Sequence, residues 1–156
     1  MTATATASIL DDLSLSITQE IRVKAPIDVT FASLIEQLGP YNETPEGTAL
    51  PMVLEAWPGG RWYRDLGGDN GHLWGFVQSI KRPVLLEIWG PLFMSTAATS
   101  NLIYRLTETP DGTLIKFRHT VVGPFPEDNR PLMGQGWAAM HARVRKAAEA
   151  AARQED

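Results

Sequence analysis

The sequence predicts an α+β fold, in which a mostly antiparallel sheet carries its helices on one face. Three observations lead to this prediction. A strand pattern and a helix pattern come first, about six short strand patterns separated largely by turn residues follow, and residues 134–154 form one long helix pattern. Tight turns join antiparallel neighbours, and a helix with one apolar stripe must bury that stripe against another layer.

The composition is that of an ordinary globular domain. The 156 residues fit one domain, which we place at residues 16–153, after a mobile N-terminal tail over residues 1–15. Apolar residues make up 44% of the chain and charged residues 21%, which leaves enough apolar surface for a core. The net charge of −4 gives no general attraction to nucleic acid or to anionic membranes, and no apolar run is long enough to span a membrane.

Several chemistries are excluded by residue type and spacing. The chain has no cysteine, which removes disulfides, thiol nucleophiles and thiolate metal ligands. The opening MTATATAS has no basic residue and no signal-peptide core, so we predict a cytoplasmic protein. His72, His119 and His141 lack the spacing of a metal motif, and no nucleotide-binding motif occurs. We therefore expect neither a metal nor a cofactor.

The first two elements are clearly bounded. Residues 16–24 alternate apolar and polar, which predicts a strand with Gln19 as the polar exception on its apolar side. Pro26 suits the first turn of a helix, and helical apolar spacing continues until Gly39–Pro40 stops it. Residues 39–48 are a loop by composition.

The strand patterns that follow are short. We predict strands at PMVLEAW, RWYRDL, HLWGFVQSI, VLLEIW, SNLIYRLTE and TLIKFRHTVV. Residues 109–112, Thr-Pro-Asp-Gly, predict a hairpin turn between the last two strands, whereas residues 92–99 give no clear prediction. The final helix is expected to start near Pro131, with Asn129 or Asp128 as its cap.

The apolar stripe of the long helix changes in bulk along its length. It carries Trp137 and Met140 near its start but Ala148 and Ala151 near its end, with Arg143 on the face turned away. Alanine allows a helix to approach the sheet closely, whereas tryptophan and methionine hold it off. We therefore expect a cavity beside the first half of the helix. The alternative is that the two bulky residues fill this space and leave no cavity.

Three stretches resemble the START-like, or SRPBCC, superfamily. They are the opening strand followed by APIDVTFASL, the run from PGGRWY through HLWGFVQSIKRPVLLEIW, and the hairpin TETPDGTLIKFRHT followed by Gly136–Trp137. Their order is most similar to the branch related to activators of the heat-shock-protein ATPase. The resemblance covers residues 16–150 and implies a helix-grip fold. In this fold a curved antiparallel sheet of about seven strands wraps the C-terminal helix and leaves a hydrophobic cavity.

Two polar side chains fall on the apolar face of the last two predicted strands. Alternation places His119 with Phe117, and it places Tyr104 with Leu102. Each polar group either completes the core with a protein or water partner or faces a ligand. Apolar surroundings would keep His119 neutral at pH 7 unless Glu87 faces it.

Glu87 is a third candidate, and its orientation is ambiguous. If Leu86 and Ile88 face inward, Glu87 lies in solvent, which avoids the cost of burying a carboxylate. The family resemblance instead implies that Leu85, Glu87 and Trp89 face inward. In that case Glu87 would be a candidate for acid–base chemistry.

Three functions fit these patterns, because the superfamily includes lipid and hormone binders, polyketide cyclases and co-chaperone domains. We favour binding of a small hydrophobic or aromatic molecule between the sheet and the long helix. The first alternative is an enzyme of the polyketide cyclase or dehydratase type, using His119 with Tyr104 or Glu87, although no catalytic residue is firmly assigned. The second is a co-chaperone-like interaction domain, and a homodimer is left open. The expected cavity residues are Trp62, Trp74, Leu102, Tyr104, Phe117, His119, Trp137, Met140 and His141.

Overall fold

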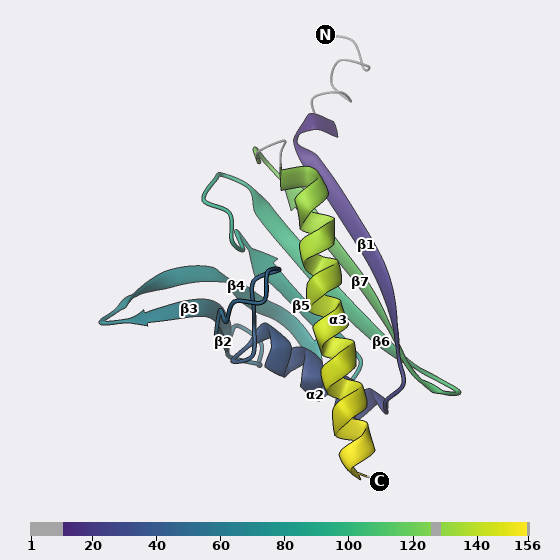
Figure 1. Ribbon diagram of the computed structural model, residues 1–156. Coiled ribbons are helices and arrows are strands. Elements are labelled where there is room, and N and C mark those ends of the chain that lie inside the picture. Colours follow the sequence, from purple (N-terminus) through teal and green to yellow (C-terminus); the bar gives the residue numbers. More distant parts are fainter. Residues whose placement is uncertain (1–10, 126–128, 156) are drawn as a thin grey trace.

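The computed structural model describes residues 11–125 and 129–155 (Figure 1). The chain forms strand β1 (Ser14–Val23), helix α2 (Ile27–Leu38), six further strands and helix α3 (Asn129–Glu155). The six strands are β2 (Val53–Leu54), β3 (Arg61–Gly67), β4 (Asn70–Lys81), β5 (Leu85–Gly90), β6 (Thr99–Thr109) and β7 (Gly112–Val122).

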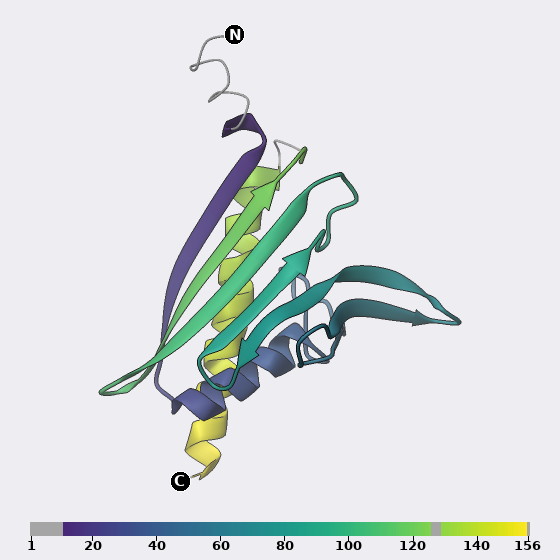
Figure 2. The ribbon, with the colours of Figure 1, turned by 180° about the vertical axis from the view of Figure 1, so that it is seen from behind.

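All seven strands belong to one antiparallel sheet in the order β1-β7-β6-β5-β4-β3-β2. Helix α3 runs along one face of this curved sheet, and α2 crosses near the C-terminal end of α3 (Figure 1). The view from behind shows the opposite face without a covering helix (Figure 2). The predicted helix-grip architecture is confirmed.

Most predicted elements are found with small shifts in their ends. The exception is PMVLEAW, which pairs only over Val53–Leu54. Pro51 has no N–H to donate to a ladder, and Trp57 has already entered the turn that Gly60 closes with a 2.8 Å hydrogen bond to the Trp57 carbonyl. Strand β1 begins at Ser14, before the expected start at residue 16. Residues 1–10 of the expected tail, and the proposed caps Asp128 and the Asn129 side chain, lie outside the described residues.

The alanine-rich half of α3 packs differently from our expectation. Ala148 is buried in the core, as predicted for a close approach. However, the backbone of α3 lies near that of α2 and β1, and α2 lies against the C-terminal half of α3 (Figure 1). Small side chains in this half therefore also allow the approach of α2, which the sequence had not indicated.

The loop between α2 and β2 (residues 39–52) is held in place by backbone hydrogen bonds. The N–H of Leu50 donates to the carbonyl of Asn42 at 2.8 Å, and the N–H of Met52 donates to the carbonyl of Gly39 at 3.0 Å. An isolated bridge joins Glu43 and Ala49. The loop is thus a narrow, ordered arm that reaches toward the first half of α3.

Candidate functional site

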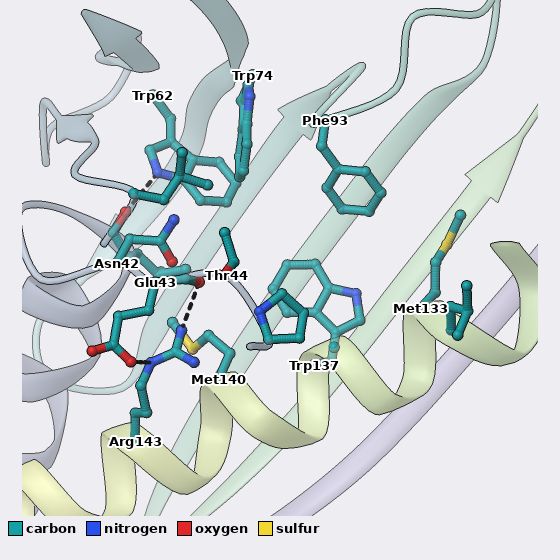
Figure 3. A pocket seen from close by; sticks show the side chains of 15 residues that line it. Asn42, Glu43, Thr44, Trp62, Trp74, Phe93, Met133, Trp137, Met140 and Arg143 are labelled. Atoms are coloured by element: carbon teal, nitrogen blue, oxygen red, sulfur yellow. Dashed lines mark hydrogen bonds and ion pairs between the residues drawn. The ribbon is translucent and has the colours of Figure 1, made fainter. Parts of the chain in front are cut away.

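A pocket of about 370 Å³ lies between the 39–52 loop, strands β3 and β4, and the first half of α3 (Figure 3). This volume is in the range of small-molecule sites. Two further hollows are lined largely by charged and polar side chains and fit an apolar molecule less well. The pocket is lined by Leu38, Asn42, Glu43, Thr44, Pro45, Leu50, Trp62, Trp74, Phe93, Leu132, Met133, Gly136, Trp137, Met140 and Arg143.

Three aromatic rings form one wall of the pocket. Trp62 is 1% exposed, and its indole N–H donates to the carbonyl of Leu38 at 2.8 Å, which satisfies a carbonyl at the end of α2. The rings of Trp62 and Trp74 meet edge to face at 5.1 Å between centroids, and those of Trp74 and Phe93 meet at 5.9 Å. These contacts hold the wall as one continuous apolar surface.

A β-bulge places Trp74 on this wall. Trp62 pairs with Gly75, but the next residue, Tyr63, pairs with Leu73, so Trp74 is an extra residue in β4. An extra residue breaks the alternation of side chains and re-aims one of them. Simple alternation along β4 would not have placed Trp74 beside Trp62.

The opposite wall comes from α3. Trp137, Met140 and Met133 project from the first half of this helix toward the aromatic wall (Figure 3). The indole N–H of Trp137 donates to Nδ1 of His119 at 3.0 Å, which fixes the orientation of the ring. The expected cavity beside the first half of α3 is therefore present, and its bulky residues line it without filling it.

His119 is completely buried, and both of its ring nitrogens have protein partners. Nδ1 accepts the Trp137 indole hydrogen, so a neutral ring carries its proton on Nε2 and donates it to Oγ of Ser100 at 2.9 Å. Burial lowers the pKa of His119 from 6.5 to about 4. A pKa lowered in this way keeps His119 neutral at pH 7, as expected from its apolar surroundings, and its hydrogen-bond partners are Trp137 and Ser100.

His141 belongs to a second buried chain of hydrogen bonds. The amide of Gln19 donates from Nε2 to the carbonyl of Gly134 at 2.9 Å, which leaves its oxygen to accept from Nδ1 of His141 at 2.7 Å. Nε2 of His141 therefore accepts the hydroxyl hydrogen of Tyr104 at 3.0 Å. Burial, and then the charge of Arg143, lower the pKa of His141 to about 4. Burial also raises the pKa of Tyr104. The polar exception on β1 thus has its partner on α3.

Four of the nine expected cavity residues line the pocket, namely Trp62, Trp74, Trp137 and Met140. Leu102, Tyr104, Phe117, His119 and His141 do not line it. Their strand faces are as predicted, because Leu102, Tyr104, Phe117 and His119 are buried beneath α3. However, the ring of Phe117 lies 4.5–4.9 Å from those of His141, Tyr104 and Trp137, and this cluster fills the space over β6 and β7. The open space is displaced toward β3, β4 and the 39–52 loop.

Glu87 lies on the outer face of the sheet, so the inward orientation implied by the family resemblance is wrong. Leu86 pairs with Tyr104, whose side chain faces α3, whereas Glu87 pairs with Ile103 and faces the other way. Leu86 and Ile88 are fully buried, and the Glu87 carboxylate accepts a 3.0 Å hydrogen bond from the side chain of Asn101. Glu87 is therefore on the opposite side of the sheet from His119 and Tyr104.

The sequence reasoning missed the charged end of the pocket. Arg143 lines the pocket although it was expected to face away, and its Nε lies 3.5 Å from Oε2 of Glu43. Its Nη2 also donates to the backbone carbonyl of Glu43 at 3.2 Å. The signal was available, because Arg143 follows Met140 by three residues and Gly136 by seven, which places all three on one side of a helix.

The described residues hold no group of three or more histidine, aspartate or glutamate side chains placed to bind a metal ion. Within residues 11–125 and 129–155, no helix is long and apolar enough to cross a membrane.

No protein-family model matches the chain, and no curated protein matches it. Several solved structures are similar to the chain in fold. An uncharacterized protein from Rhizobium leguminosarum is 19% identical with a TM-score of 0.69, over 87% of this chain and 95% of that one. CalU16 from Micromonospora echinospora is 20% identical with a TM-score of 0.56, over 85% of this chain and 71% of that one. The di-domain aromatase/cyclase (ARO/CYC) StfQ of the steffimycin biosynthetic pathway is 15% identical with a TM-score of 0.62, over 98% of this chain and 55% of that one.

These likenesses concern the fold. Together with the seven-stranded sheet and the long C-terminal helix, they support a helix-grip fold. Of the three, StfQ is an ARO/CYC protein and the Rhizobium leguminosarum protein is uncharacterized, and none of them points to the branch of heat-shock-protein ATPase activators.

Proposed function

We propose that the protein binds a small hydrophobic or aromatic molecule in the pocket between the 39–52 loop and the first half of α3. The observation that carries this proposal is the pair of facing apolar walls, with Trp62, Trp74 and Phe93 on one side and Trp137 on the other (Figure 3). Covering apolar surface in such a hollow is favourable by about 25 cal/mol per Å². Flat molecules fit best, because rings pack well against the faces and edges of other rings.

Binding fits the site better than catalysis does. An acid–base enzyme needs titratable groups that converge on the bound molecule. His119 and Tyr104 are buried in the ring cluster beside the pocket, and Glu87 is on the other side of the sheet. The aromatase/cyclase StfQ shares the fold, but one fold hosts many functions.

An interaction role of the co-chaperone kind is a weaker proposal, and it would use another surface. The rings of Phe76 and Trp89 lie 5.4 Å apart where the two strands pair, and Trp89 is half exposed. The resemblance to activators of the heat-shock-protein ATPase rests on the three sequence stretches alone. The two proposals are separable, since the aromatic pocket and the Phe76–Trp89 surface share no residue.

Two glycines of α3 provide a matched test of the pocket. A Cβ on Gly136, which lines the pocket, would lie 3.7 Å from Pro45, whereas a Cβ on Gly134 would meet no neighbouring element of the described chain within 4 Å. Leucine at either position favours the helix by about 0.8 kcal/mol over glycine. Only Gly136→Leu places its side chain in the pocket.

The measurement is a fluorescence titration with N-phenyl-1-naphthylamine, a neutral dye that brightens in apolar surroundings. We expect the wild type and Gly134→Leu to bind the dye alike, and Gly136→Leu to bind it at least tenfold more weakly, as expected when about 1.4 kcal/mol of contact is lost. Equal binding by all three proteins, or no binding by the wild type, would overturn the proposed function.

A further inference from the structure

One charged pair stands in an otherwise apolar pocket. Of the fifteen lining residues, only Glu43 and Arg143 are charged. They lie together at one end, away from Phe93 and Met133, and the side chains of Asn42 and Thr44 are close by (Figure 3). A molecule that fills the space between the aromatic walls would therefore end beside a guanidinium, a carboxylate, an amide and a hydroxyl.

The guanidinium of Arg143 is incompletely satisfied by its partner. Its Nε lies 3.5 Å from the Glu43 carboxylate and, among the described residues, has no acceptor within hydrogen-bonding geometry. The exposed pair of Arg61 and Glu55 shows the tight alternative, with two side-chain hydrogen bonds of 2.7 and 3.0 Å. An arginine carries five N–H donors in a planar fork that matches a carboxylate or a sulfonate. Arg143 thus has donors to offer to a second anion.

Glu43 and Arg143 differ in how easily their side chains can move into solvent. The side chain of Glu43 is 39% exposed and sits on the 39–52 loop, whereas that of Arg143 is 20% exposed and projects from α3. An incoming anion could replace the Glu43 carboxylate, which would then turn into water at little cost. An incoming cation would have to displace Arg143 from a partly buried place, or else accept its repulsion.

We propose that the pocket takes flat hydrophobic molecules that carry an anionic group, and that Arg143 holds this group in place of the Glu43 carboxylate. The proposal rests on the proposed function and names its ligand class. The apolar body of the ligand packs between the aromatic walls. The charge selects among molecules that fit equally well by shape. A partly buried guanidinium whose Nε makes no hydrogen bond to its carboxylate partner favours an anionic ligand over its neutral analogue.

Two dyes with a common body test this selection. N-phenyl-1-naphthylamine is neutral, and 8-anilino-1-naphthalenesulfonate carries a sulfonate on the same ring system. For Arg143→Met we expect the affinity for the sulfonate to fall about tenfold or more, as for loss of a charge-assisted hydrogen bond, while the affinity for the neutral dye stays within about twofold. Arg145→Met removes the same charge from an exposed position of the same helix and serves as the control. Its affinity for both dyes should remain near that of the wild type.

Glu43→Gln provides a second arm that leaves Arg143 in place. Removing the competing carboxylate should raise the affinity for the sulfonate dye and leave that for the neutral dye unchanged. If Arg143→Met fails to fold, this arm alone decides, and an unchanged sulfonate affinity would overturn the proposal. If the neutral dye binds and Gly136→Leu blocks it, but neither charge variant alters sulfonate binding, the proposed function stands and the anion selection is refuted. If neither dye binds the wild type, the proposed function itself fails.

Discussion

The two buried histidines should make the protein lose stability in mild acid, well above the pH at which carboxylates titrate. The pKa values of His119 and His141 are lowered from 6.5 to about 4 by burial. The unfolded chain therefore takes up two protons below pH 6.5 that the folded protein excludes. The unfolded state binds more protons in this range. The stability that the two neutral histidines contribute is therefore fully present above pH 6.5 and is lost as the pH falls toward 4.

The size of the effect follows from the same shifts. One pKa unit corresponds to about 1.36 kcal/mol, so each histidine should remove about 2 kcal/mol between pH 7.5 and pH 5, and the two together about 4 kcal/mol. Both side chains are almost fully buried, so screening by solvent reduces this little. The pKa of Glu55 is lowered from 4.5 to about 2 by its hydrogen bonds to Arg61, so its contribution is lost only at more acidic pH.

The assay is urea unfolding at several pH values between 5 and 6.5, followed by tryptophan fluorescence. The free energy of unfolding of the wild type should fall by up to about 2.7 kcal/mol for each pH unit, the limit for two protons. His119→Phe should reduce that limit to about half, whatever its effect on absolute stability, since one proton site is gone. A His119→Phe protein with the slope of the wild type would refute the assignment of His119 as a buried neutral base.

Three further predictions test individual contacts. His119→Phe leaves the indole N–H of Trp137 and the hydroxyl of Ser100 without a partner, so the melting temperature should fall, by an amount equivalent to about 1–3 kcal/mol for each group, while dye affinity changes less. Tyr104→Phe removes the donor to His141 and should cost about 1–3 kcal/mol in urea unfolding. Glu87→Gln should change neither dye binding nor stability by more than about 0.5 kcal/mol, and a loss of binding would place Glu87 in the function after all.

The sequence predicts the strand faces well because one face of the sheet is buried under α3. Such burial imposes strict alternation, and a shift of one residue would turn every apolar side chain outward. Phe117 and His119 on β7, and Leu102 and Tyr104 on β6, follow this rule. The orientation of Glu87 also follows from alternation, since Leu86 and Ile88 are fully buried, and the family resemblance misled at this position.

The position of the cavity could not be predicted in the same way. Face assignments tell which residues point inward, but they do not tell which inward residues touch. The cluster around Phe117 closes the space over β7, and only ring sizes and distances in three dimensions show that it does so. Trp74 reaches the pocket through a bulge, and Asn42 and Glu43 reach it through a loop whose path is set by its own backbone hydrogen bonds. Neither feature has a periodic signal.

Trp137 connects the pocket to the buried core, so ligand binding in the pocket and protonation of His119 in the core affect each other. Its side chain lines the pocket, while its indole N–H donates to Nδ1 of His119. A protonated His119 would carry a hydrogen on Nδ1 and could no longer accept from Trp137. Conversely, a ligand that holds the Trp137 ring in its present orientation favours the neutral histidine, because binding and protonation act on the same contact. Ligand affinity and acid stability are therefore linked through one hydrogen bond, and saturating ligand should shift the loss of stability to lower pH.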